Sequence, residues 1–285
     1  MAKIKLVASD LDGTLLTSQK KITRRLSRAL EQLDQLGIYF VPATGRAFQA
    51  LPECVRRLPN LHYVITCSGA SVYDAVQRRM LFSNPLPPDA IDEILQAVAG
   101  TDHILEVMHS GNGYIDKRDW EKIPSYSMTD SHIRYIKTTR IPSDDIMQEI
   151  EMHKASIEQM NFIFRDTAQR QQVWATLQGQ DYATFTYYSE RNIEITGKEA
   201  TKANALKRLC EMLEIDAENV LALGDGDNDV DMLYWAGASA AVANAPQHVK
   251  DAANILTESC DEDGAAIVLD RVIAAMVLEQ LLKRS

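Results

Sequence analysis

The fold of this chain is decided by one stretch near its start, Lys3-Ile4-Lys5-Leu6-Val7-Ala8-Ser9-Asp10-Leu11-Asp12-Gly13-Thr14-Leu15-Leu16. Its first part is a short apolar, β-branched run, which indicates a buried strand. Ligands of open parallel sheets bind outside the carboxyl ends of the strands. Side chains two positions apart on an extended segment point the same way, so Asp10 and Asp12 are expected to face one point. A metal cation or a shared proton would relieve their repulsion. A simple turn explains Gly13 and one aspartate, but not the pair.

Strands that end in small or polar residues recur along the chain. Residues 38–43, 63–67 and 220–223 are predicted strands, followed by Thr44, Ser68 and Gly224-Asp225. Thr23 is suited to cap the first helix, and Gly37 to end it. Further strands are predicted at 193–195 and 238–242, and helices at 23–36, 47–58, 202–213, 230–236 and 263–282. This alternation predicts an α/β fold with a doubly wound, mostly parallel sheet and right-handed crossovers.

The middle of the chain has a different character. Residues 84–88, Asn-Pro-Leu-Pro-Pro, are typical of a linker. Beyond them we predict strands at 104–108, 161–164 and 184–188, and helices at 90–99, 144–153 and 167–177. We therefore expect a core made of residues 1–84 and 190–285, into which an α+β domain of residues 85–189 is inserted.

Composition limits the partners and the compartment. The 285 residues carry a net charge of −10, which argues against nucleic acid or an anionic membrane as the main partner. An anionic small molecule is still compatible, because a local metal ion or lysine can reverse the field. Four cysteines without a CxxC motif indicate buried thiols in a reducing compartment, and the six histidines show no ligand spacing. With no signal peptide and no membrane-spanning run in the sequence, a cytoplasmic protein is expected.

The polar residues at the strand ends form an ordered set. The motifs run from Asp10-Leu11-Asp12-Gly13-Thr14 through Thr44-Gly45-Arg46 and Lys202 to the segment Gly224 to Asp229. This order resembles the haloacid dehalogenase superfamily of phosphohydrolases. The size and position of the insertion are similar to the type-C2 cap of the Cof-like branch, which includes bacterial sugar-phosphate phosphatases.

The resemblance implies a role for each motif. Asp10 would be the nucleophile that forms an aspartyl-phosphate, and Asp12 the general acid and then base. Mg²⁺ would be held by Asp10, the backbone carbonyl of Asp12, and Asp225. Asp229 would orient water or hold the lysine. The phosphate- and substrate-binding residues would be Thr44, Gly45, Arg46, Lys202 and Asn228.

The implied activity is Mg²⁺-dependent hydrolysis of small phosphomonoesters, with sugar phosphates as the leading class of phosphorylated metabolite. Pyridoxal phosphate, flavin mononucleotide and nucleotides stay open as substrates, and the sequence indicates neither the oligomeric state nor the cap residues that contact the leaving group. Three positions depart from the family pattern, namely Ser68, Ala243 and Asp263. They concern peripheral contacts and substrate preference.

Three other classes of protein are alternatives. A non-catalytic sugar-phosphate sensor of this fold would keep the phosphate site but lose Asp10 or Asp12, and both are present. A phosphoacceptor regulatory domain is shorter and needs no second acid two residues on. A dinucleotide-binding oxidoreductase is disfavoured because no predicted strand ends in GxGxxG.

Overall fold

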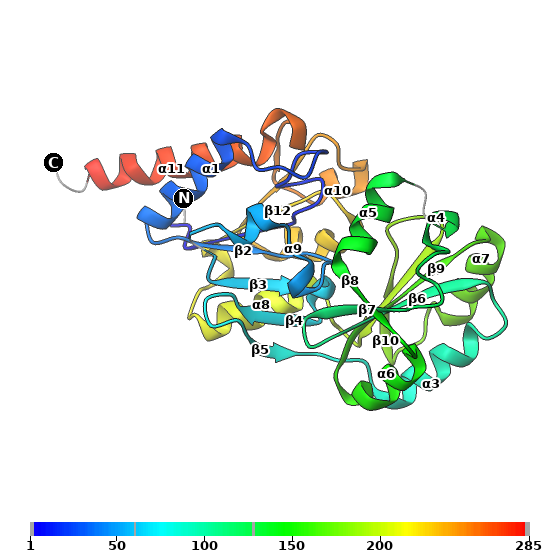
Figure 1. Ribbon diagram of the computed structural model, residues 1–285. Coiled ribbons are helices and arrows are strands. Elements are labelled where there is room, and N and C mark those ends of the chain that lie inside the picture. The colour runs from blue at the N-terminus through cyan, green and yellow to red at the C-terminus, as the bar shows by residue number, and fades with distance from the viewer. Residues whose placement is uncertain (1–2, 60, 127–128, 283–285) are drawn as a thin grey trace. The chain divides into compact units, whose positions relative to one another are not determined.

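The computed structural model describes residues 3–59, 61–126 and 129–282 (Figure 1). The chain divides into two compact units. The first comprises Met1–Thr44, Pro52–Leu81 and Thr201–Ser285, and the second comprises Gly45–Leu51 and Phe82–Ala200. In the described part of the chain, no helix combines the length and the apolar character that crossing a membrane would need.

The first unit is built on a parallel five-stranded sheet. Its order is β14 (Ile255–Leu256), β13 (Ala238–Ala241), β12 (Val220–Gly224), β1 (Leu6–Ser9) and β2 (Tyr39–Pro42). All four residues of β1 are buried, so both faces of this interior strand are covered. The predicted α/β fold with a parallel sheet is confirmed.

Helices and short 3₁₀ turns connect the strands of the first unit. Thr23 caps α1, because its hydroxyl accepts from the backbone N–H of Leu26 at 3.1 Å. The helix is followed by Gly37, with φ +69°. The helices are α1 (Arg24–Gln35), α2 (Glu53–Arg56), α8 (Lys202–Met212), α9 (Val230–Trp235), α10 (Gln247–Asp251) and α11 (Gly264–Leu282). The 3₁₀ turns are η2 (Cys67–Gly69), η4 (Ala217–Asn219), η5 (Asp227–Asp229) and η6 (Cys260–Glu262).

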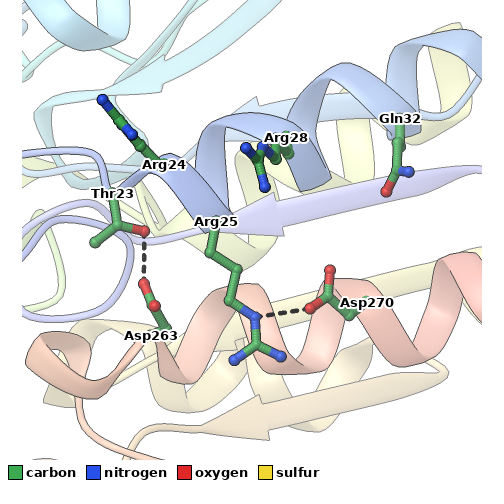
Figure 2. Close-up of a pocket in the computed structure, with 7 residues that line it drawn as sticks. All are labelled: Thr23, Arg24, Arg25, Arg28, Gln32, Asp263 and Asp270. Carbon is green, nitrogen blue, oxygen red and sulfur yellow. Dashed lines mark hydrogen bonds and ion pairs between the residues drawn. The ribbon is translucent and has the colours of Figure 1, made fainter.

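Helices α1 and α11 lie side by side (Figure 1). Figure 2 shows the hollow that they line, in which Arg25 Nε donates to Asp270 at 2.8 Å and Thr23 donates to Asp263 at 2.5 Å. Asp263 has φ +61°, a left-handed conformation that aspartate tolerates better than most residues. This departure from the family pattern therefore has a structural role, since Asp263 joins the start of α11 to the cap of α1.

The third predicted strand belongs to a small sheet of its own. β3 (Tyr63–Thr66) pairs antiparallel with β4 (Ser71–Asp74), and β5 (Arg79–Ser83) lies beside β4. Isolated parallel bridges, Phe40 to Leu61 and Ala43 to Ile65, connect the region of β3 with that of β2. The region of β3 therefore runs parallel to that of β2 at these two bridges. The sequence pattern did not indicate β4 or β5.

The predicted helix at 47–58 is wrong. The chain instead forms η1 (Phe48–Ala50), an extended turn, and then α2. Pro52 is the cause, because proline has no N–H to donate and forces the preceding residue out of the helical region. Leu51 accordingly has φ −61° and ψ +136°.

The second unit contains a six-stranded sheet. Its order is β10 (Ala183–Thr186), β11 (Asn192–Gly197), β9 (Ile157–Phe164), β6 (His103–His109), β7 (Asn112–Asp116) and β8 (Arg140–Ser143). The helices are α3 (Pro88–Ala97), α4 (Ile123–Tyr126), α5 (Asp130–Thr139), α6 (Ile146–His153) and α7 (Thr167–Leu177), with η3 at Lys154–Ser156. The sequence pattern did not indicate β7, β8, α4 or α5.

Both faces of this sheet carry apolar clusters, and one face also buries a polar pair. Leu105 and Phe162 pair across β6 and β9 and belong to an apolar core. The next pair, Glu106 and Asn161, lies on the other face, as side chains alternate along a strand. Both are buried, and the carboxylate of Glu106 accepts from Arg140 Nε at 2.7 Å and from Asn161 Nδ2 at 2.6 Å.

We expect Arg140→Met to destabilise the second unit strongly. The change leaves the Glu106 carboxylate buried without its cation, which costs about 3–5 kcal/mol. The matched control is Lys117→Met, because Lys117 and Asp144 form an exposed ion pair at 3.1 Å whose loss should cost at most about 1 kcal/mol. Denaturant unfolding of both variants measures the difference, and equal losses would contradict the prediction.

Candidate active site

Asp10 and Asp12 have different surroundings at the end of β1. Asp10 follows the strand directly, and its backbone N–H donates to the carbonyl of Leu223 in β12 at 2.9 Å. Its side chain is buried. The carboxylate of Asp12 is more exposed and forms an ion pair with Lys20 Nζ at 2.8 Å. The two aspartates therefore start from different electrostatic environments.

Lys202 lies next to Asp10 although the two are 192 residues apart in sequence. It is the first residue of α8, which Thr201 caps by accepting from the N–H of Asn204. Lys202 is buried, and its Nζ donates to Asp10 Oδ1 at 2.6 Å and to Asp229 Oδ1 at 2.8 Å. Burial by itself would lower the pKa of Lys202, but the charges of the two carboxylates outweigh it and raise that pKa above its usual value.

The loop after β12 holds the other acidic residues. Both oxygens of Asp229 are engaged, because Oδ2 also accepts from the backbone N–H groups of Asp225 and Gly226, each at 3.0 Å. Asp225 Oδ1 accepts from the hydroxyl of Thr14 at 2.6 Å. Thr14 thus links the loop after β1 to the loop after β12.

Asn244 strengthens the same link. Its Nδ2 donates to the carbonyl of Gly13 at 2.8 Å, and its Oδ1 accepts from the N–H of Cys260 at 3.0 Å. The sequence pattern assigned no role to Thr14 or Asn244. The family motif Gly-Asn-Ala, which is Ala243-Asn244-Ala245 here, was the available signal for Asn244.

The remaining strand-end residues lie around the same loops. Thr44 is buried, and its carbonyl accepts from the N–H of Ser68 at 3.0 Å. Ser68 has φ +54°, and its hydroxyl accepts from Asn228 Nδ2 at 3.5 Å. Serine therefore still connects the loop after β3 to the loop after β12, although the family usually has asparagine there.

Glycines allow these loops to approach each other. A Cβ on Gly13 would lie 2.4 Å from Asp225 Oδ2, and one on Gly224 would lie 2.4 Å from the Cβ of Asp229. Gly13 also has φ +100°, a conformation that disfavours other residues. The glycine of the first motif is thus required by both its backbone conformation and its contact.

The cluster carries an excess of negative charge. Burial raises the pKa of Asp10 to about 8, with Lys202 opposing and the charges of Asp229 and Asp225 adding to the rise. Burial also raises the pKa of Asp225 to about 6. Three carboxylates and one ammonium sum to −2 when all are ionised, so a divalent cation would balance the charge.

The donor set fits a hard divalent metal. Asp10, Asp225 and Asp229 each offer a carboxylate oxygen, and these atoms lie within 4.8 Å of one another. Oxygen ligands are those that Mg²⁺ prefers. Because Asp229 already accepts three hydrogen bonds, Asp10 and Asp225 are the more available ligands.

Gly45 and Arg46 belong to the second unit. The guanidinium of Arg46 lies over the ring of Tyr135, 4.4 Å from its centroid, and its Nη1 donates to the carbonyl of Ala50 at 3.2 Å. The segment that follows Thr44 thus packs with the insertion, which the sequence pattern did not indicate.

The chain matches the family model of haloacid dehalogenase-like hydrolases over residues 7–269. Phosphatase YwpJ of Bacillus subtilis is 25% identical, over 95% of this chain and 100% of that protein. The 5-amino-6-(5-phospho-D-ribitylamino)uracil phosphatase YcsE of the same organism is 28% identical, over 92% of this chain and 93% of that protein.

Solved structures share the fold. A haloacid dehalogenase-like hydrolase from B. subtilis has a TM-score of 0.82 at 25% identity and covers 94% of this chain and 99% of its own. A sugar phosphatase of subclass IIB has a TM-score of 0.76 at 20% identity, over 94% of this chain and 98% of its own.

We expect the pKa of Asp10 to make the metal-free protein less stable as pH rises. A folded pKa of about 8, above the ordinary value of 3.8, means that the folded state keeps a proton that the unfolded state releases. This contribution to the free energy of unfolding therefore decreases from about pH 4 to about pH 8. In chelator, the melting temperature of wild type minus that of Asp10→Asn should fall between pH 5.5 and pH 8. A difference that stays constant or grows would contradict the assignment.

We expect Gly13→Ala to weaken binding of Mg²⁺. The added methyl group meets Asp225 and strains a left-handed residue, which costs about 1–2 kcal/mol in strain alone. Gly37→Ala is the matched control, because Gly37 has φ +69° but nothing within 4 Å of its Cβ position. Both variants should lose stability in thermal unfolding, and only Gly13→Ala should lose Mg²⁺ affinity in calorimetric titration. Equal affinities would show that Gly13 does not position Asp225.

Proposed function

The chain belongs to the haloacid dehalogenase-like hydrolases, and from that premise we propose that it is a Mg²⁺-dependent phosphatase that hydrolyses small phosphomonoesters through an aspartyl-phosphate. One observation carries the proposal. A buried aspartate, Asp10, is held by Lys202 beside Asp225 at the carboxyl end of β1. This arrangement suits a nucleophile that must attack a negatively charged phosphoryl group.

Asp10 is the nucleophile in this proposal. Lys202 donates to its Oδ1, which orients the carboxylate so that its other oxygen can attack phosphorus. The bond from phosphorus to the ester oxygen breaks as the bond to Asp10 forms. The covalent product divides one difficult displacement into two easier ones.

Asp12 moves the protons. In the first step its protonated carboxyl gives a proton to the leaving alkoxide, and in the second its carboxylate takes a proton from the water that attacks the aspartyl-phosphate. The carboxyl group of Asp12 lies beside Lys20, whose Nζ is 2.8 Å from Asp12 Oδ1.

Asp10, Asp225 and the backbone carbonyl of Asp12 would hold Mg²⁺, which when bound neutralises charge on the carboxylates and the phosphoryl oxygens. Thr44, the N–H of Gly45, Arg46, Lys202 and Asn228 are proposed to bind phosphoryl or substrate oxygens. Lys202 is proposed both to orient Asp10 and to bind a phosphoryl oxygen. Its ammonium is positively charged and is already fixed between Asp10 and Asp229.

A sugar or polyol phosphate is the proposed substrate class. The relative YcsE is named for a substrate with a phosphorylated ribityl chain, which supports this class. Residues 85–189 are proposed as a cap that contacts the leaving group, and the compact unit that contains them extends to Ala200 and includes residues 45–51. A cytoplasmic location agrees with the four cysteines, all described, of which none forms a disulfide.

Asp10→Asn and Asp12→Asn should fail at different steps. Asp10→Asn removes the nucleophile, so both turnover and phosphoenzyme should vanish. Asp12→Asn should form phosphoenzyme from an activated aryl phosphate, which needs little acid, and then hydrolyse it slowly. With a sugar phosphate its loss should approach the upper end of the roughly 10²–10⁴-fold range of general acid–base catalysis. Rapid-quench trapping of labelled phosphate measures both variants.

The control is Asp251→Asn, an exposed aspartate of α10 that should leave turnover unchanged. Wild-type turnover should stop in chelator and return with Mg²⁺. Phosphoenzyme in Asp10→Asn but not in Asp12→Asn would reverse the two roles. Absence of phosphoenzyme throughout would refute the covalent route, and absence of turnover on a broad panel of phosphomonoesters would favour a sensor.

A further inference from the structure

The second unit contains a cluster of two histidines and a glutamate that the proposed reaction does not use. His109, Glu149 and His153 each present a ligand atom, and the three atoms lie within 4.8 Å of one another. We propose that this cluster binds a divalent transition-metal ion of the Zn²⁺ class. The site is independent of the phosphatase proposal, since it lies wholly within the second unit.

The fold brings the three residues together from two elements. Glu149 and His153 are four positions apart on α6, a spacing that places both on one face of a helix. His109 is the last residue of β6. The sequence showed no ligand spacing because the first ligand, His109, is 40 residues from the second, Glu149.

A tight turn fixes His109. His109 pairs with Asn112 across a two-residue turn. The turn residues, Ser110 and Gly111, have φ +50° and +74°. The N–H of Gly111 donates to the buried carboxylate of Glu158 at 2.8 Å. Left-handed backbone at both central positions is typical of a hairpin turn that matches the strand twist, so the end of β6 is held in place.

The distances agree with metal coordination. His109 Nε2 lies 2.9 Å from Glu149 Oε1, and His153 Nε2 lies 3.5 Å from the same oxygen. Ligand atoms at about 2.0–2.1 Å from a tetrahedral zinc ion lie about 3.3 Å from each other. The three groups therefore need only small shifts in separation to share one ion.

Ring orientation shows which side chain must move. The His109 ring is sandwiched between Tyr114, with centroids 4.4 Å apart, and His153, with centroids 3.9 Å apart. Stacked rings hold their lone pairs in nearly parallel planes, so an ion between the rings would lie outside both planes and one imidazole must turn to face it. His153 can do so, since its side chain is 38% exposed and it is the last residue of α6, whereas His109 is buried.

The electrostatic environment of His109 suits a divalent cation. His109 Nε2 shares a proton with Glu149, and binding of a metal ion would displace that proton from the nitrogen. Glu149 supplies the negative charge that a divalent cation requires. Lys154, the residue after His153, is a cation that forms ion pairs with Asp92 at 2.5 Å and with Glu151 at 3.4 Å.

The ligand types separate this site from the aspartate cluster. Two imidazoles and one carboxylate suit Zn²⁺, Ni²⁺ or Cu²⁺, whereas Mg²⁺ prefers oxygen ligands only. Three protein ligands leave a fourth position of a tetrahedral ion for water. The aspartate cluster offers oxygen alone, so the two sites should differ in the metal that they select.

The test uses the full-length protein and Zn²⁺ in competition with a chromophoric chelator. Wild type should bind Zn²⁺, and excess Mg²⁺ should leave that binding unchanged. His153→Ala and Glu149→Gln should each weaken it by at least about 100-fold, since even residues outside the ligand set change metal affinity by 10–100-fold. These two variants avoid the buried His109, whose replacement risks misfolding.

Controls locate the ion. His62→Ala removes a histidine of the first unit, and Met152→Ala changes an exposed neighbour on α6, so both should bind as wild type does. Asp225→Asn should also retain Zn²⁺ binding. Substitution with Co²⁺ should give visible absorption that His153→Ala abolishes.

The proposal is overturned if wild type fails to bind Zn²⁺ at micromolar protein and metal. It is equally overturned if His153→Ala and Glu149→Gln bind as wild type does. Loss of binding in Asp225→Asn with retention in His153→Ala would place the ion in the aspartate cluster instead.

Discussion

The candidate active site depends on the burial of one ammonium group. Removing the charge of Lys202 from water is costly, and hydrogen bonds to Asp10 and Asp229 compensate for it. Burial, reinforced by the neighbouring carboxylates and opposed by Lys202, raises the pKa of Asp10 and that of Asp225. The cation that stabilises two of the anions thus leaves a surplus of negative charge that suits a divalent metal.

Backbone packing determines where that ammonium lies. The loop after β3 has left-handed residues at Cys67, Ser68 and Gly69, and a Cβ on Gly69 would lie 2.1 Å from the carbonyl oxygen of Thr201. The loop and the start of α8 can therefore meet only without a side chain at position 69. Because Thr201 caps α8, this contact places the helix start and the lysine that follows it. The steric requirement for glycine at position 69 thus helps to place the Lys202 ammonium between its two carboxylates.

The two compact units contain different kinds of polar groups. The first gathers oxygen ligands at the ends of parallel strands, where loops from distant parts of the sequence converge. The second buries a Glu106–Arg140 ion pair on one face of its sheet and a histidine–glutamate cluster where β6 meets α6. Apolar clusters cover both faces of this sheet, so these polar groups are buried beside apolar side chains rather than on a separate polar face.

Local features and the family can be read from the amino-acid order. The apolar run before Asp10, the cap at Thr23 and the order of the motifs are short-range patterns, and they predicted the parallel sheet and the residues that could act on phosphate. Tertiary structure alone decided the contacts of Thr14 with Asp225 and of Asn244 with Gly13, which are 211 and 231 residues apart, and the meeting of His109 with His153. It also decided that residues 45–51 pack with the insertion. Such contacts are not visible in the sequence because local periodicity records which face of an element is buried, but not which distant element covers it.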